Sequence, residues 1–120
     1  MIKGGIGMSE VERLTDELCR AIRTSREYAE YKEAYKILEQ YPGLLRETNE
    51  LRRQNFELQN SEDSDGMFDR VETFRKNYAE LRKHQEVSDF LQAELCLARM
   101  VQSIGNAVTG CLDMNVDFLD

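Results

Sequence analysis

Residues 87–112 read VSDFLQAELCLARMVQSIGNAVTGCL, the longest run of helix-compatible apolar residues in the chain. Their apolar positions recur at steps of three, four and seven and form two adjoining rows on one helix. The first row comprises Phe90, Leu97, Val101, Ile104, Val108 and Cys111, and the second comprises Leu91, Leu95 and Ala98. Two adjoining rows are wider than one partner helix can cover. We therefore expect a spine helix against which the other helices, and a second subunit, pack.

Four shorter helices are expected before this spine. Ser9 and Glu12 have the spacing of a capping box, Thr24 and Glu27 repeat it, and Pro42 suits the first turn of a helix. Segment 60–66 is acidic, contains no apolar residue and is the one clear loop. The fold predicted is an all-α domain in which helical hairpins pack on the long C-terminal helix. The five helices are expected at about 10–23, 25–40, 43–59, 67–83 and 87–112.

The composition agrees with one mostly helical domain. The chain has 120 residues, one Pro and no Trp, and 32% of its residues are charged. Its net charge of -7 repels phosphate backbones, so direct binding of nucleic acid is disfavoured. We expect residues 1–8 to be a disordered leader, in which Met8 offers a second start, residues 9–112 to be the helical domain, and residues 113–120 to be an acidic tail.

The cysteines and the hydropathy pattern predict a cytoplasmic protein. Cys19, Cys96 and Cys111 are odd in number and widely spaced, which favours free thiols in a reducing compartment. No run approaches the roughly 18 apolar residues that a membrane span needs, and the first nine residues lack the apolar core of a signal peptide.

Aromatic residues mark the inward faces of two other helices. Tyr28, Tyr31 and Tyr35 give the second helix a wide amphipathic face. Tyrosines can stack bases, but no basic residues surround these, so core or interface packing is the favoured interpretation. In the fourth helix the residues expected to point inward are Phe68, Val71, Phe74, Tyr78 and Leu81.

The sharpest chemical candidate is a calcium loop in segment 61–72. Ser61, Asp63, Asp65 and Glu72 occupy the first, third, fifth and twelfth ligand places of an EF-hand, with Gly66 at the sixth. Ser61 stands where a carboxylate is expected, and no second hand pairs with this one. If the fourth helix begins by Met67, Glu72 cannot reach the loop without unwinding a turn. The favoured alternative is therefore an acidic, solvated connection.

The remaining polar candidates point to structure rather than catalysis. His84 is the only histidine, which excludes a helical di-iron site and the usual histidine-based catalytic zinc site. No residue pattern indicates a nucleophilic triad, and no enzymatic activity or cofactor is expected. Glu94 lies on the apolar stripe of the spine and needs a partner there. Arg99 and the Tyr31/Tyr35 face are the expected partners in a structural pair, and a functional contact at the edge of a second subunit is the alternative.

The order of these segments resembles the YlbF/YmcA family of small helical bacterial regulators. The motifs that carry the resemblance are SREYAEYKEA at 25–34 and DFLQAEL at 89–95, and the similarity covers about residues 9–112. The resemblance implies a self-associating, cytoplasmic regulator without catalysis of its own. Family members act on competence, sporulation and biofilm development, and serve as an accessory complex that directs the endoribonuclease RNase Y. Carried over by position, Tyr28, Tyr31, Phe90, Leu91 and Glu94 match as packing residues.

One departure from the family pattern concerns cysteine. Some members hold iron-sulfur clusters through closely grouped C-terminal cysteines, whereas Cys96 and Cys111 are far apart here. No cluster is therefore expected.

These observations predict a dimeric regulatory adaptor that acts through protein–protein contacts. Expected partners are a second copy, related YlbF/YmcA-type proteins and a ribonuclease, and the charged helix face from Arg46 to Glu57 is a solvent-side candidate surface. The alternatives are a calcium- or metal-responsive helical module and a structural homo-oligomer. The interface and packing candidates are Tyr28, Tyr31, Tyr35, Phe90, Leu91, Glu94, Leu97 and Val101.

Overall fold

The computed structural model describes residues 9–62 and 65–112, which contain five α-helices and no strand. The all-α, five-helix prediction is therefore confirmed, and each helix begins close to its predicted start. The predicted leader at 1–8, the predicted tail at 113–120 and the candidate ligand Asp63 lie outside the described residues. The helices are α1 (Glu10–Arg23), α2 (Arg26–Leu38), α3 (Pro42–Gln59), α4 (Met67–Leu81) and α5 (Gln85–Gly110).

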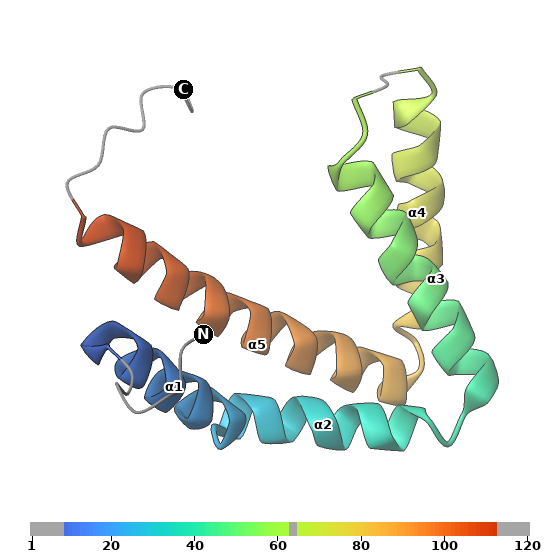
Figure 1. Cartoon of the computed structure of the whole chain (residues 1–120). Coiled ribbons are helices and arrows are strands. Elements are labelled where there is room, and N and C mark those ends of the chain that lie inside the picture. The colour runs from blue at the N-terminus through green and yellow to red at the C-terminus, as the bar shows by residue number, and fades with distance from the viewer. Residues whose placement is uncertain (1–8, 63–64, 113–120) are drawn as a thin grey trace.

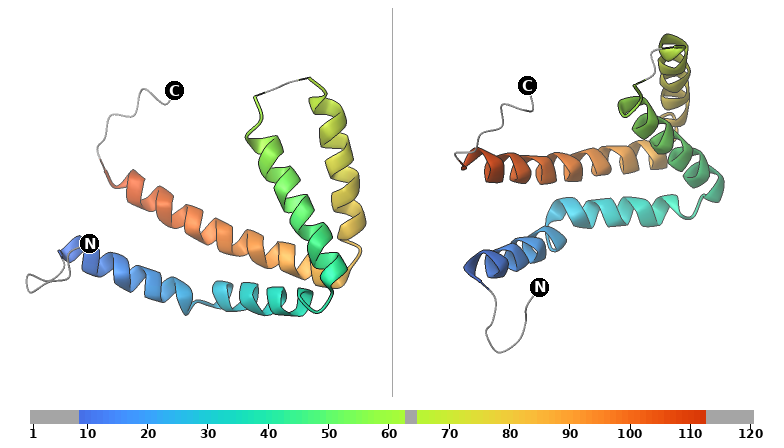
Figure 2. Two further views of the ribbon diagram at one scale, coloured as in Figure 1. Left: turned by 45° about the vertical axis from the view of Figure 1, so that its right-hand side comes forward. Right: turned by 45° about the horizontal axis from the view of Figure 1, so that its top comes forward.

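The helices form an arm and a hairpin that meet at one corner. The arm consists of α1, α2 and α5: α1 leads into α2, and α2 packs antiparallel to α5 (Figure 1). The hairpin consists of α3 and α4, which pack on each other and project from the end of the arm where α2 stops and α5 starts. At the other end of the arm, α1 and the last turns of α5 diverge, as all three views show (Figure 2).

Local sequence signals explain where the helices begin. The Ser25 hydroxyl accepts a hydrogen bond from the Tyr28 N–H at 3.1 Å and caps α2. Pro42 begins α3, where its missing N–H leaves no intrahelical bond unmade. Gly66 precedes α4 with φ +71°, a conformation that favours glycine because a Cβ would be strained there. The start of α2 lies where it was predicted, but its cap is Ser25 and not Thr24, whose hydroxyl donates to the Arg20 carbonyl at 3.0 Å instead.

The core lies at the corner, where α2, α5 and the base of the hairpin meet. Leu38, Val87 and Phe90 are fully buried, and Ala34 is nearly so. The hydrophobic residues packed around this cluster come from α2, α3, α4 and α5, and they are Tyr31, Tyr35, Leu44, Leu45, Leu81, Leu91 and Ala93. The first half of the spine helix is thus covered by its neighbours, as the sequence predicts.

Phe68 does not point inward as expected, because its side chain is 76% exposed. The side of α4 that lines the groove against α3 carries Arg70, Thr73 and Phe74. At 100° per residue, Phe68 lies about 200° around the helix from Arg70, and it therefore faces away from α3. The prediction was wrong because apolar periodicity alone does not say which side of α4 packs on α3.

Thr48 of α3 carries the one buried side-chain oxygen without a hydrogen-bond partner among the described residues. Its side chain is fully buried, so the hydroxyl has lost its water without replacement. We expect Thr48→Val, which puts a methyl group in place of the hydroxyl, to stabilise the fold by about 1 kcal/mol in urea unfolding. Thr48→Ser, which keeps the hydroxyl and removes the methyl group, is expected to destabilise it. A loss of stability in Thr48→Val would show that the hydroxyl has a partner after all.

Candidate functional site

Phe90 of α5 is the centre of the residues that join the arm to the hairpin. Its ring centroid lies 5.4 Å from that of Tyr31 and 5.9 Å from that of Tyr35, both on α2. The guanidinium carbon of Arg52, on α3, lies over the ring at 5.2 Å from its centroid. Tilted aromatic pairs and a cation above a ring face are both favourable arrangements. Three predicted packing residues thus meet at one point, together with an arginine from a third helix.

Glu94 is paired with Arg52, and not with Arg99 or the tyrosine face as expected. Arg52 Nη2 lies 2.7 Å from Glu94 Oε2, and Arg52 Nε donates to the same oxygen at 2.9 Å. The two side chains remain 37% and 32% exposed, so the pair is partly solvated and its net contribution to stability is at most about 1 kcal/mol. Arg52 reaches Glu94 because α3 crosses α5 at the corner. This pairing could not be predicted from local sequence patterns, because the two residues are 42 positions apart.

The other predicted packing residues lie along the arm in different environments. Tyr28 is half-buried, with Lys32 Nζ 5.3 Å from its ring centroid. Leu91 packs against the core, and Leu97 is half-buried. Val101, one further turn along α5, is 49% exposed. Coverage of the spine helix by this chain therefore fades beyond Leu97.

Beyond that point α5 is an apolar helix in contact with water. From 95 to 112 its only charged residue is Arg99. A helix that is apolar on most sides is normally buried. The large apolar side chains of α1 and of this half of α5 that remain most exposed will be called the open face. They are Val11 at 73%, Leu14 at 49% and Leu18 at 39% on α1, with Val101 at 49% and Val108 at 54% on α5. Leu95, which is 42% exposed, lies about 120° around α5 from Val101 and is not included.

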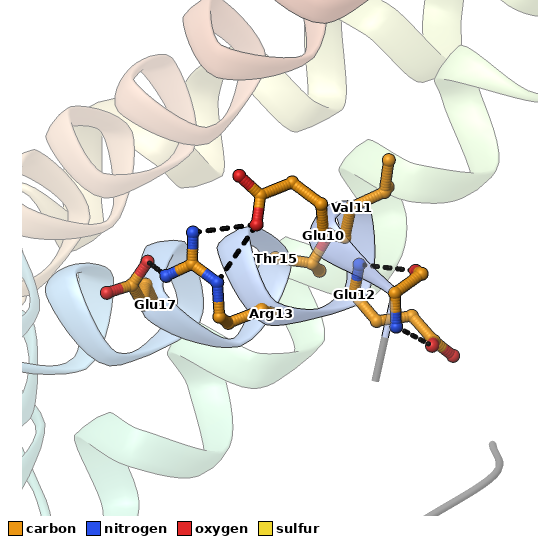
Figure 3. Close-up of polar contacts among 7 residues, drawn as sticks. Glu10, Val11, Glu12, Arg13, Thr15 and Glu17 are labelled. Atoms are coloured by element: carbon orange, nitrogen blue, oxygen red, sulfur yellow. Dashed lines mark hydrogen bonds and ion pairs between the residues drawn. The ribbon is translucent and has the colours of Figure 1, made fainter. Parts of the chain in front are cut away.

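α1 is held in helical form by its own local interactions. Ser9 and Glu12 form the predicted capping box, with each side chain accepting a hydrogen bond from the other residue's N–H (Figure 3). Arg13 bridges two carboxylates on the same helix, Glu10 at 2.8 Å and Glu17 at 2.9 Å. No residue of α1 is buried. Within residues 9–62 and 65–112, its apolar residues Val11, Leu14 and Leu18 therefore stay exposed on a formed helix.

The hairpin carries a mixed-charge surface. Arg53 of α3 pairs with both Glu50 and Glu57 along the exposed side, and its hydrogen bond holds the pKa of Glu50 below the usual value. A hydrogen bond from Lys83 likewise lowers the pKa of Glu80. His84 lies beside these groups in a groove of about 470 Å³ between α3 and α4. The groove is lined by Arg46, Glu47, Glu50, Leu51, Gln54, Asn77, Glu80, Leu81 and His84.

The calcium candidates are only partly placed by the structure. Ser61 and Asp65 are described, but Asp63 is not. α4 begins at Met67, and Glu72 in its second turn lies 3.9 Å from Arg75. Because α4 begins at Met67, Glu72 cannot reach the loop without unwinding a turn of the helix. Within residues 9–62 and 65–112, no three His, Cys, Asp or Glu side chains are grouped as a metal would require. Calcium binding stays a prediction, which a calcium titration followed by thermal unfolding decides.

Two further features bear on the setting of the chain. Over the described residues, no helix combines the length and the hydropathy needed to cross a bilayer. All three cysteines are free thiols; Cys19 and Cys111 are exposed and Cys96 is partly buried.

Comparison with known proteins identifies the family. No curated protein and no solved structure gives a significant match. A family model described as control of competence regulator ComK, YlbF/YmcA, matches residues 11–113, which span all five helices. The chain therefore belongs to the YlbF/YmcA family, whose description connects it with the control of competence.

Proposed function

We propose that the protein is a non-catalytic regulatory adaptor that acts through protein–protein contacts in the control of competence. The family assignment supports the regulatory role. We extend the proposal to RNase Y-dependent mRNA processing, and through it to sporulation and biofilm development, in a cytoplasmic complex with related YlbF/YmcA-type proteins. In this role the protein binds other proteins, and its exposed surfaces rather than a catalytic site carry the function.

The open face is the observation that carries the proposal. Apolar side chains on a stable helix gain free energy when they leave water, at about 25 cal/mol per Å² of apolar surface. Monomeric soluble proteins rarely expose large apolar patches, and those that do usually bind something there. Val101 and Val108 are about half exposed on α5, and from residue 95 to the end of that helix the only charged residue is Arg99. A partner that brings apolar side chains to this end of the arm would cover them.

A second copy of the chain is the partner that fits the open face best. It presents the same two apolar helices, so a twofold arrangement brings each open face against the other. The net charge of -7 opposes association only weakly there, because α1 carries four acidic and three basic residues and residues 95–112 carry only Arg99. Self-association would leave the hairpin, at the other end of the arm, free for a different protein (Figure 1).

Affinity capture from the native cytoplasm tests the adaptor role. We expect the tagged full chain, after chemical cross-linking and mass spectrometry, to recover a ribonuclease or YlbF/YmcA-type relatives. We also expect the cross-links to the ribonuclease to map to residues 42–81. Recovery of the protein alone would contradict the adaptor role and favour a structural homo-oligomer.

Matched variants assign the two surfaces. Val101→Asp/Val108→Asp changes the open face, and Arg53→Glu changes the exposed side of the hairpin while leaving the core intact. If the hairpin binds the ribonuclease, Arg53→Glu lowers its recovery and leaves self-association unchanged. Equal loss of the ribonuclease with both variants would contradict the separation of the two surfaces.

A further inference from the structure

The hairpin is joined to the arm by two short connections that lie together at the corner. Residues 39–41 connect α2 to α3, and residues 82–84 connect α4 to α5. Near these connections Leu44, Leu45 and Leu81 pack against the core. Arg82 Nη2 also donates a hydrogen bond to Ser88 Oγ at 2.9 Å. These contacts hold the base of the hairpin in place. The angle between the hairpin and the arm then depends on contacts farther along α3 and α5.

Arg52 and Glu94 make the outermost polar contact between the hairpin and the arm. Arg52 is ten residues into α3, which places it about 15 Å along the helix from Pro42 at 1.5 Å per residue. Glu94 lies about 14 Å along α5 from Gln85 by the same rise. Among the described residues, no hydrogen bond or ion pair joins α5 to the part of α3 beyond Arg52. The pair therefore joins the two helices at the outer edge of the corner core, beside Phe90.

The guanidinium of Arg52 is held in one orientation by contacts on several sides. Its Nε and Nη2 both donate to Glu94, and its Nη1 donates to Asn49 Oδ1 at 2.9 Å on the preceding turn of α3. Its guanidinium carbon lies over the ring of Phe90 at 5.2 Å from the ring centroid, and that ring is fully buried. An arginine fork fixed in this way defines a direction as well as a distance, which a flexible lysine does not.

We propose that the Arg52–Glu94 pair is a brace that sets the angle between the hairpin and the arm, and that the hairpin swings about residues 39–41 and 82–84 when the brace is broken. Both charges are partly exposed, so water can solvate them when the pair opens. The helices on either side of the hinge keep their own packing, α3 on α4 and α2 on α5. The inference rests on the geometry of the corner and holds whether or not the proposed function is correct.

Distance measurements between the hairpin and the arm test the brace. Spin labels are attached at Arg75→Cys on α4 and Glu30→Cys on α2, both exposed, in a full chain whose three native cysteines are replaced by serine or alanine. Labelled protein is diluted with unlabelled protein, so that pulsed electron paramagnetic resonance reports distances within one copy. We expect one narrow distribution in the parent protein. With Arg52→Met the distribution should at least double in width and move to a new mean, with helix content by circular dichroism unchanged.

Two further variants keep the test decisive. Arg53→Met removes the same charge one position along, from an arginine that pairs only within α3, and should leave the distribution narrow. Glu94→Leu breaks the brace from the other side with a side chain of similar volume, and it carries the test if Arg52→Met loses helix content. A narrow, unmoved distribution in the folded brace variants would overturn the proposal, and so would equal broadening in Arg53→Met.

Discussion

Replacing Phe90 by alanine is expected to destabilise the folded protein by about 3–5 kcal/mol, the usual cost of deleting a buried aromatic ring. The side chain is fully buried, contacts the rings of Tyr31 and Tyr35 and supports the guanidinium of Arg52. The loss is a large part of the roughly 5–15 kcal/mol that holds a typical domain together. Urea unfolding followed by circular dichroism at a fixed protein concentration measures it, because association shifts apparent stability.

Phe56→Ala is the matched control for the Phe90 experiment. Phe56 is 66% exposed on α3, so its removal is expected to change stability by less than about 0.5 kcal/mol. If Phe90→Ala does not fold, Phe90→Leu gives a smaller loss that can still be measured. A change below about 1 kcal/mol in Phe90→Ala would mean that the corner is not the main core of the molecule.

Replacing Val101 and Val108 together by aspartate is expected to weaken self-association by at least about a hundredfold, because burying two unpaired charges costs more than about 3 kcal/mol. The two residues lie on the same side of α5 and are 49% and 54% exposed within one chain. The substitutions should therefore leave the fold of the single chain intact. Sedimentation equilibrium gives the association constant, and circular dichroism checks the helix content.

Ser103→Asp/Asn106→Asp is the control for this pair of charges. It adds the same two charges to the same helix, about 140° to 200° around from Val101 at 100° per residue. We expect this control to associate as the parent protein does. A parent protein that stays monomeric at micromolar concentration would contradict the self-association on which the comparison rests.

The helices were predictable because their signals are local. The capping box of Ser9 and Glu12, Pro42 at the start of α3 and Gly66 before α4 each act within a few residues of a helix end. Apolar periodicity then defines the inward side of α2 and of the first half of α5. At Phe68 periodicity gave the wrong side of the helix, because it does not contain the position of the neighbouring helix.

The candidate site was only half predictable for the same reason. The stripe position of Glu94 shows that this carboxylate needs a partner, but the choice of Arg52 depends on how α3 crosses α5. Arg52 itself reads as one more charge on a solvated helix. The open face shows a second limit of prediction from sequence. The double stripe of α5 predicts a wide contact surface, but it does not say how much of that surface is covered by other helices of the same chain. Val101 was expected on a packing surface and is 49% exposed, whereas Met100 and Ile104 beside it stay partly buried.

The placement of the hairpin between α2 and α5 also bears on the order in which the chain folds. α3 and α4 are joined by a short segment, so closing that helix pair costs little chain entropy. The pairing of α2 with α5 has to close a much longer stretch of chain. Once the hairpin has formed, however, its two ends lie together at the corner, and the remaining search is short. The α3–α4 hairpin, which separates α2 from α5 in the sequence, thus brings these two helices together in space.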